Sequence, residues 1–351
     1  MSIAAKAARL VLVIMLLLAL LAGAAYAGFL LFLGRLEPAD PSAAPVEIEI
    51  PAGATTADVA DILAEGGLIQ DPNVFRFYVR YRDLDARIIS GRYELSAAMS
   101  VDEILAKLVA GDVVVRRFTL PEGLTVAMMA DLLDEAGVVD REDFLDAVAA
   151  AAADNPYLPA DLDVAQPMEG YLFPATYEYH SGITAEEVVA MLLDRFQAVW
   201  TDELLARADE MGLSVHEVVT LASIVETEAR VAAEQPAIAG VYLNRLAIGM
   251  PLQADPTVYY ALGLPRTERL FYEHLEVDSP YNTYKYPGLP PGPIASPGES
   301  AIRAVLYPET HEYYYFVAKN DGSGEHYFAS TYEEHLENVD LAEANLAARQ
   351  P

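Results

Sequence analysis

The chain has 351 residues, of which 53% are apolar, and it carries 53 acidic against 22 basic residues and no cysteine. This length suggests about two domains, and the balance of apolar and charged residues excludes a chain that is disordered throughout. The net charge of −31 repels phosphate backbones and argues against nucleic acid as a partner. The lack of cysteine excludes thiol nucleophiles, disulfides and thiolate zinc sites.

The first element in chain order is an uncharged apolar stretch at residues 10–33. As a helix it is about 36 Å long, enough to cross the hydrocarbon core of a membrane. The basic residues before it predict that residues 1–9 stay in the cytoplasm, so that the cell membrane is crossed once and the chain from Arg35 onward lies outside. The alternative is a cleaved signal peptide, because Ala-Tyr-Ala at 25–27 resembles a cleavage site, although the apolar run continues beyond it.

A proline-containing linker at 34–45 leads into an internal repeat with an offset of 70 residues. IPAGATTADVADIL at 50–63 recurs as LPEGLTVAMMADLL at 120–133, and each copy runs from a strand-like stretch through a turn into an amphipathic helix. The region 46–118 is therefore expected to be a small α+β module, either a spacer or a carbohydrate-binding module of the lysin-motif type. Its predicted elements are a strand at 46–50, helices from 55 and near 72–82, a strand at 87–95, a helix at 100–110 and a strand at 113–120.

The remaining chain, residues 119–351, is expected to form a mixed α/β domain, which makes the overall class α+β. Residues 251–297 are rich in proline, glycine and tyrosine and predict a long ordered loop with little regular structure. The other predicted elements are helices near 140–152, at 184–211, at 214–231 and from 236 to before 249, a hairpin of strands at 312–318 and 325–329, and a final helix from about 331.

Common cofactor and metal motifs are missing from the sequence. There is no P-loop and no GxGxxG, and the six histidines are scattered. His216-Glu217 begins an HExxH pattern, but Thr220 stands where the second histidine would be. We therefore expect no cofactor and no metal.

The helix at 214–231 contains the candidate catalytic group. Glu226 follows an uncharged run, and at helical spacing it shares a face with Ala222, Ser223 and Ala229, whose small side chains leave room for a bulky ligand. Partial desolvation there would raise the pKa of the carboxyl group, as a general acid requires.

A purely structural role for Glu226 is the alternative. Arg230 lies one helical turn later and would form an exposed ion pair with it. Glu228 points about 200° away on a helix and is expected to be solvated.

Two longer segments carry a family resemblance. LASIVETEARVAAEQPAIAGVYLNRLAIGMPLQADPTVYYALG at 221–263 and DSPYNTYKYPGLPPGPIASPGESAIRAVLYP at 278–308 closely resemble the YceG-like family, the endolytic murein transglycosylases of the bacterial cell envelope. The resemblance extends from about residue 46 to the C-terminus. It implies cleavage of the bond between N-acetylmuramic acid and N-acetylglucosamine within nascent peptidoglycan strands. The implied products have 1,6-anhydro-muramyl ends, and their formation terminates strand elongation. The resemblance also implies peptidoglycan synthases as partners.

The resemblance also implies that Glu226 is the catalytic glutamate. A lytic transglycosylase uses the 6-hydroxyl of the sugar as the nucleophile, so one carboxyl group can act first as acid and then as base. Substrate-binding residues are expected from the aromatic loop, the family motif and the Glu226 face; they are Ser223, Gln253, Asp255, Tyr281, Asn282, Thr283 and Tyr284. Turn formation or local packing is the alternative for the loop residues and for Asp255.

Two rival functions remain open at this point. Glu169 is a candidate second carboxylate and substrate-binding residue, and if it reached the pocket, hydrolysis to reducing ends would be favoured. A scaffold that binds peptidoglycan without cleaving it is the other alternative.

Overall fold

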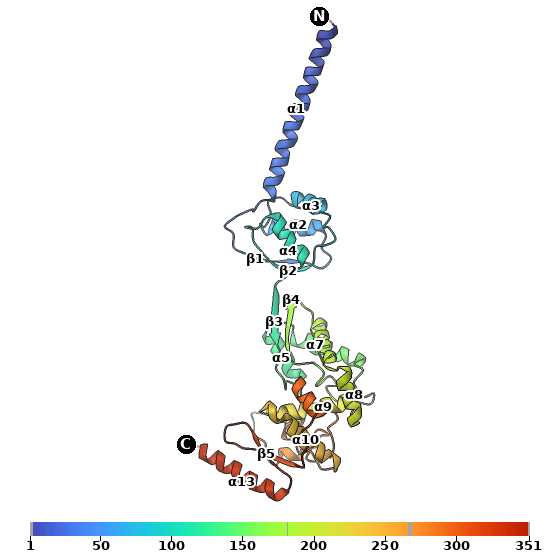
Figure 1. The fold of residues 1–351 in the computed structure, drawn as a ribbon, viewed down its shortest axis with the longest axis vertical. Helices are drawn as coiled ribbons and strands as arrows, with labels where there is room; N and C mark the ends of the chain where they lie inside the picture. The colour runs from blue at the N-terminus through green and yellow to red at the C-terminus, as the bar shows by residue number, and fades with distance from the viewer. Residues whose placement is uncertain (1–2, 181, 266–268, 350–351) are drawn as a thin grey trace. The chain divides into compact units, whose positions relative to one another are not determined.

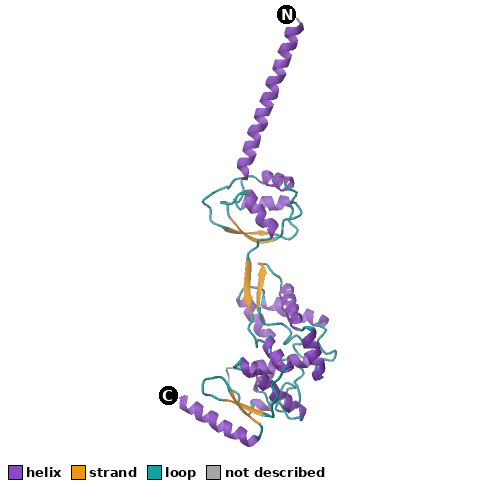
Figure 2. Ribbon diagram, in the orientation of Figure 1, coloured by secondary structure: helices purple, strands orange, loops and turns teal. Residues whose placement is uncertain are grey.

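The computed structural model describes residues 3–180, 182–265 and 269–349 (Figure 1). The chain forms two compact units, the first of which comprises Met1–Arg116 and Glu178–Gly182, and the second Arg117–Tyr177 and Ile183–Pro351. Helices predominate, and the described strands pair into three two-stranded sheets (Figure 2). This mixture of helices and strands agrees with the predicted α+β class.

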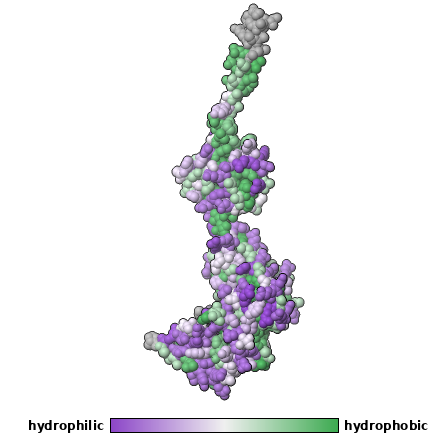
Figure 3. All heavy atoms as spheres, in the orientation of Figure 1, coloured by the Kyte–Doolittle hydropathy of each residue, from purple (hydrophilic) through white to green (hydrophobic). Residues whose placement is uncertain are grey.

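The N-terminal helix α1 (Ile3–Leu36) is apolar along most of its length. The most apolar window of its segment Ile14–Leu36 has a mean hydropathy of 2.4 and contains no buried residue. Figure 3 shows the hydrophobic side chains on the surface of this helix. By length and composition, α1 can cross a membrane, because a helix of this length spans the hydrocarbon core.

Apart from Glu178–Gly182, the rest of the first unit contains the strands and helices expected between residues 46 and 110. Strands β1 (Val46–Ile50) and β2 (Gly91–Leu95) pair antiparallel with Ile48 opposite Tyr93. Between and after them lie helices α2 (Thr56–Glu65), α3 (Pro72–Tyr81) and α4 (Val101–Ala110). The core of the module is formed by side chains from all five elements, including Ile50, Val59, Leu63, Phe75, Val79, Tyr93, Leu95, Ile104, Leu105 and Leu108.

Local capping explains why these helices begin where they do. The side chains of Thr55 and Ser100 accept hydrogen bonds from the third residue of α2 and α4, and the acidic side chains at those positions bond back to the cap. Asp71 caps α3, whose first residue, Pro72, has its φ angle already set for a helix. These signals are local, which is why the sequence was sufficient to place the helices.

The second unit repeats the turn and helix of the first. Strands β3 (Val115–Thr119) and β4 (Thr176–His180) pair with each other, and each has residues in both units. In the second unit, β3 leads through a turn to α5 (Val126–Glu135). Gly123 in this turn has φ +77°, and its counterpart Gly53 in the first copy has φ +76°. Both turns therefore have the same left-handed backbone conformation, which a glycine adopts without steric cost.

Helix α9 (Val215–Glu228) is the central helix of the second unit. It contacts α8 (Asp202–Met211), α10 (Gln235–Ala247), α11 (Asp255–Leu262) and α12 (Glu299–Leu306). His216 and the continuous run of its residues from Val218 to Val225 are buried. The other elements of this unit are α6 (Arg141–Ala151), α7 (Ala185–Val199), the antiparallel hairpin of β5 (Tyr315–Ala318) and β6 (His326–Ala329), and α13 (Tyr332–Arg349).

Three sequence predictions differ from the structure. The helix predicted at 184–211 is divided into α7 and α8, because Trp200 leaves the helical conformation and Thr201 caps a new helix through its hydroxyl group. The loop predicted at 251–297 contains α11, in which Pro256 occupies a first-turn position that suits proline. Strand β4 and helix α12 were not predicted.

Candidate active site

The C-terminal half of α9 holds the segment Ile294–Gly298 in place. Ser223 is fully buried, and its hydroxyl group donates to the carbonyl of Thr220 (2.7 Å) and accepts the N–H of Ile294 (3.0 Å). On its other side, this segment bonds to the turn before α5, where Ser296 exchanges two 2.8 Å backbone hydrogen bonds with Gly123 and Leu124. The segment is therefore fixed between α9 and the turn of the second repeat.

Glu226 lies in the last turn of α9 and is half-buried. Its Oε2 accepts a hydrogen bond of 3.2 Å from the N–H of Gly298, the residue that caps α12. This bond comes from a buried backbone position and orients the carboxyl group. Arg230 is exposed and lies beyond the end of α9, so the helical spacing on which an ion pair with Glu226 depends does not exist.

The helical spacing predicts that Glu228 is solvated, but in the structure its side chain packs against α10. It is half-buried, and it accepts a hydrogen bond of 3.0 Å from the hydroxyl group of Tyr242 on α10. The prediction was wrong because it considered only the faces of an isolated helix, whereas α10 packs against this end of α9.

The structure brings the family motif and the aromatic loop together. The N–H of Gln253 donates to the carbonyl of Thr283 (3.1 Å), and the hydroxyl group of Tyr284 donates to Asp255 (2.5 Å). Burial raises the pKa of Tyr284, and the carboxylates of Asp255 and Glu228 raise it further. Gln253, Asp255 and Tyr284 are therefore close to the C-terminal end of α9.

Gln253 has an unusual backbone conformation in this group. It is exposed and has φ +48°, which is uncommon for a residue other than glycine. Such conformations are found often at functional sites, where the surrounding structure maintains them. Here the surrounding structure includes Arg245, whose buried guanidinium group donates to the carbonyls of Leu252 (2.6 Å) and Tyr314 (2.6 Å).

Three other residues of the expected binding set are engaged within the protein. Asn282 is fully buried, and its side-chain amide donates to the carbonyls of Leu275 and Val277, both at 2.9 Å. The buried hydroxyl group of Thr283 contacts that of Thr257 (2.9 Å). These two side chains hold the loop, and Ser223, as described above, holds the neighbouring segment.

Tyr281 is half-buried against Tyr260, with ring centroids 4.8 Å apart. Burial raises the pKa of Tyr281 to about 12, so its hydroxyl group stays protonated at neutral pH.

Glu169 is a buried acid at the N-terminus of α5. It is 3% exposed, and its Oε1 accepts the N–H of Val126 (2.9 Å) while the hydroxyl group of Tyr260 donates to Oε2 (3.3 Å). Burial raises the pKa of Glu169 to about 8, against the lowering effect of these hydrogen bonds. Glu169 is among the residues that line a pocket of about 490 Å³ between α5 and α11.

The comparisons with known proteins agree with the motifs. Residues 48–341 match the YceG-like family. The chain is 35% identical over 321 residues to the endolytic murein transglycosylase of Bacillus subtilis (strain 168), covering 88% of each chain. This chain belongs to the YceG-like family.

Two further relatives of this YceG-like chain extend the comparison. The endolytic murein transglycosylase of Streptococcus pneumoniae (strain D39) is 31% identical over 352 residues, which cover 90% of this chain and 61% of that protein. A crystal structure of a yceG-like protein of Listeria monocytogenes matches with a TM-score of 0.58 and 37% identity, covering 84% of this chain and 99% of that one. The family predicted from the motifs is therefore confirmed.

A second carboxylate, which the sequence analysis missed, lies close to Gly298 in this YceG-like chain. A Cβ atom built on Gly298 would lie only 1.9 Å from Oε1 of Glu122, whose side chain is exposed. The repeat contained a signal for this residue: the equivalent position of the first copy is Ala52, so the turn itself does not require an acid. Comparing the two copies for differences as well as identities would have singled out Glu122.

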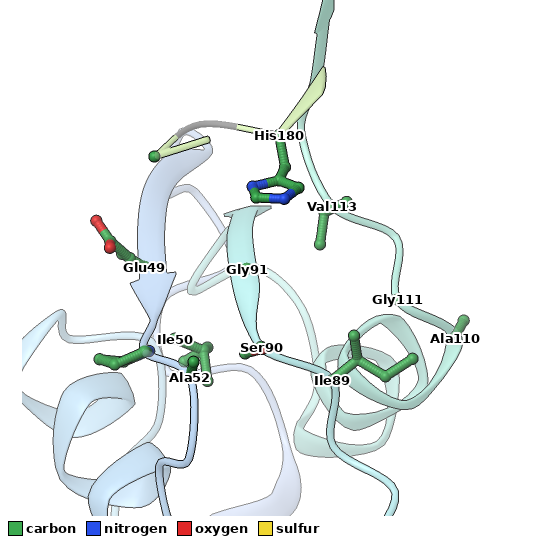
Figure 4. Close-up of a pocket in the computed structure, with 12 residues that line it drawn as sticks. Glu49, Ile50, Ala52, Ile89, Ser90, Gly91, Ala110, Gly111, Val113 and His180 are labelled. Carbon is green, nitrogen blue, oxygen red and sulfur yellow. The ribbon is translucent and has the colours of Figure 1, made fainter. Parts of the chain in front are cut away.

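The first unit has a pocket of its own, with a volume of about 520 Å³ (Figure 4). It is lined by the end of β1, by the start of the turn that follows, by residues 89–91 before and at the start of β2, and by the C-terminal end of α4. Figure 4 shows the imidazole ring of His180 over the start of β2 at Gly91.

The site has the residues for acid–base chemistry and for binding polar ligands. Within the described ranges, no group of three or more histidine and acidic side chains is arranged to hold a metal ion. The group that can exchange a proton is the half-buried carboxyl group of Glu226. The polar side chains available to a ligand are those of Gln253, Asp255 and Tyr284.

Proposed function

We propose that this chain is a membrane-anchored lytic transglycosylase that cleaves N-acetylmuramic acid–N-acetylglucosamine bonds within nascent peptidoglycan strands. The products have 1,6-anhydro-muramyl ends, and cleavage terminates strand elongation. Membership of the YceG-like family and the name endolytic murein transglycosylase of its relatives support the activity. The structural observation that carries the proposal is the half-buried carboxyl group of Glu226, held by the backbone N–H of Gly298.

In the proposed reaction, one carboxyl group first donates a proton and then accepts a different one. Glu226 donates its proton to the glycosidic oxygen, and the bond between this oxygen and the anomeric carbon breaks with its electron pair on the leaving sugar. The 6-hydroxyl oxygen then bonds to the anomeric carbon, and its proton passes to Glu226. The hydrogen bond from Gly298 fixes the orientation of the carboxyl group for both transfers.

We assign Gln253, Asp255 and Tyr284 to sugar binding, with Tyr281 at the edge of the same loop. Their support is the bond between Tyr284 and Asp255, the exposure of Gln253 and Asp255, and the proximity of this group to the end of α9. The buried positions of Ser223, Asn282 and Thr283 support a positioning role.

We assign Glu169 to the interior of the catalytic domain, and its raised pKa supports a protonated, neutral carboxyl group there. This assignment favours the lytic reaction over a hydrolysis that uses Glu169 as its second carboxylate.

We further propose that α1 anchors the enzyme in the cell membrane, with residues 1–9 in the cytoplasm and the catalytic domain, residues 119–351, outside. The apolar segment Ile14–Leu36 supports the anchor. Mass spectrometry of the protein extracted from membranes tests it, because an N-terminus at Gly28 would mean that a signal peptide had been removed.

The module at 46–118 is proposed to bind glycan strands in a lysin-motif-like manner. The pocket lined by Ala52, Ser90 and Gly111 supports this role. Filling it with Ser90→Trp is expected to reduce the sedimentation of the chain with purified peptidoglycan; unchanged sedimentation would contradict binding there. Peptidoglycan synthases are the proposed protein partners, on the basis of the family alone.

The decisive test of the activity uses the full chain in detergent with un-crosslinked glycan strands. Mass spectrometry counts anhydro and reducing ends for the wild type, for Glu226→Gln and for Glu135→Gln, a control on an exposed carboxylate at the end of α5. We expect anhydro ends from the wild type and the control, and none from Glu226→Gln. Reducing ends with oxygen from solvent would indicate a hydrolase, and binding without any cleavage would indicate a scaffold.

A further inference from the structure

Glu122 and Glu226 approach the same glycine from different parts of the chain. The Oε2 atom of Glu226 is 3.2 Å from the nitrogen of Gly298, and Oε1 of Glu122 would be 1.9 Å from a Cβ on that residue. Because the nitrogen and Cβ of one residue are about 2.5 Å apart, these two carboxylate oxygens are at most about 8 Å from each other.

Backbone bonds make this proximity a fixed property of the fold. Glu122 precedes Gly123, whose N–H donates to Ser296 at 2.8 Å, and Gly298 is two residues beyond Ser296. Gly298 is buried and begins α12, so its position is set by the packing of α12 against α9. Its missing side chain is what allows the carboxyl group of Glu122 to lie there.

The internal repeat indicates that Glu122 is not needed to build the turn. The first copy has Ala52 at the equivalent position, and the following glycines have φ +76° and φ +77°. The backbone therefore forms the same turn with or without an acid. The carboxyl group of Glu122 is exposed and stands beside the proposed acid–base residue of the second unit.

We propose that Glu122 is a second catalytic carboxylate, which acts as an anion beside the anomeric carbon of the N-acetylmuramic acid residue being cleaved. The inference rests on the proposed transglycosylase function. In glycosidases the two carboxyl groups that flank a scissile bond are roughly 5 to 9.5 Å apart, a range that the approach of Glu122 to Glu226 allows.

In this role Glu122 forms and breaks no covalent bond. As the glycosidic bond breaks, positive charge develops on the anomeric carbon and the ring oxygen, and the carboxylate of Glu122 stabilises this charge until the 6-hydroxyl oxygen has bonded to the carbon. The proton still moves only between Glu226, the leaving oxygen and the 6-hydroxyl group. Since the charge exists mainly in the transition state, Glu122 accelerates the chemical step more than it strengthens substrate binding.

The test compares Glu122→Gln, which keeps the size of the side chain but removes its charge, with the wild type in the full chain. A unit charge about 4 Å from a partly developed cation contributes enough to change the rate by at least about 30-fold at an effective dielectric constant near 20. We expect kcat to fall by that factor or more, KM to stay within about threefold, and the products to keep anhydro ends. Glu122→Asp, which retains the charge, should recover part of kcat.

Two measurements distinguish catalysis from structure. The first compares the affinity for glycan strands of Glu226→Gln with that of the double variant Glu226→Gln/Glu122→Gln. The second compares the melting temperatures of Glu122→Gln, Glu122→Ala and the wild type. Both quantities should remain unchanged if Glu122 acts on the transition state. A kcat for Glu122→Gln within about threefold of the wild type would overturn the proposal. So would a loss of strand binding or stability that accounts for the lost rate. A failure of the proposed function is recognised separately, by a wild type that cleaves no strands or a Glu226→Gln variant that remains active.

Discussion

Replacing Glu169 by glutamine should remove a pH-dependent loss of stability from the second unit. The carboxyl group is buried between the start of α5 and Tyr260, and burial raises its pKa from an ordinary value of 4.5 to about 8. Glutamine has the shape of the protonated acid. Its carbonyl oxygen can accept the N–H of Val126, and its amide can donate to the hydroxyl group of Tyr260.

The sign of the effect follows from the proton balance. Between about pH 4.5 and pH 8, the folded protein keeps the proton on Glu169 while the unfolded chain releases it, so folding binds a proton. The free energy of unfolding therefore falls as the pH rises through this range. The pKa of Glu169 is 4.5 in the unfolded chain and about 8 in the folded protein, which lowers the free energy of unfolding by about 5 kcal/mol in total. This decrease is complete above pH 8. The Glu169→Gln variant lacks this loss.

Thermal unfolding of the full chain in detergent measures the difference. Trp200 is the single tryptophan of the chain and is buried in the same unit as Glu169, so its fluorescence reports the unfolding of that unit. We expect the melting temperature of the wild type to fall between pH 5 and pH 9 by roughly 10 °C more than that of Glu169→Gln. The two proteins differ only at residue 169, so the contributions that they share cancel in the comparison.

Glu135→Gln removes a carboxyl group from an exposed position of α5 and serves as the control, whose melting curve should follow that of the wild type. Parallel pH dependence of the wild type and Glu169→Gln would refute the reasoning, because it would mean that Glu169 is ionised in the folded protein. A variant that is less stable than the wild type at pH 8 or above would refute it equally.

Three further predictions concern the surroundings of the site. Ser214→Ala removes the cap of α9 and should lower the free energy of unfolding by about 1 kcal/mol in urea titrations, with cleavage rates within about threefold of the wild type. Gly298→Ala adds a methyl group 1.9 Å from the carboxyl oxygen of Glu122, so strand cleavage should fall at least about tenfold, whereas wild-type rates would mean that Glu122 can move aside without consequence. Arg245→Met leaves the buried carbonyl of Leu252 and the partly buried carbonyl of Tyr314 without their donor and should destabilise the unit by about 3 kcal/mol, seen as a lower urea midpoint; an unchanged midpoint would show that other donors replace the guanidinium group.

Local signals account for what the sequence alone determined. The order of strands and helices in the module at 46–118, the start of α9 at Ser214 and the hairpin of β5 and β6 all depend on residues a few positions apart. A capping side chain or a turn acts within one or two helical turns, so the chain can be interpreted there without knowledge of its packing. The family was likewise accessible, because its motifs are continuous segments.

Tertiary packing decided the remaining features. The break between α7 and α8 and the burial of Glu228 against Tyr242 depend on contacts with other elements, which hydrophobic periodicity does not describe.

The arrangement of the site also depends on contacts between distant elements. Glu122 and Glu226 are separated by about a hundred residues, and their carboxyl groups come within about 8 Å of each other because the segment before α12 bonds to α9 on one side and to the repeated turn on the other. The sequence singled out Glu226 on α9 as the candidate acid, but only the fold determined which carboxylate lies near it, because residues distant in the chain become neighbours through packing.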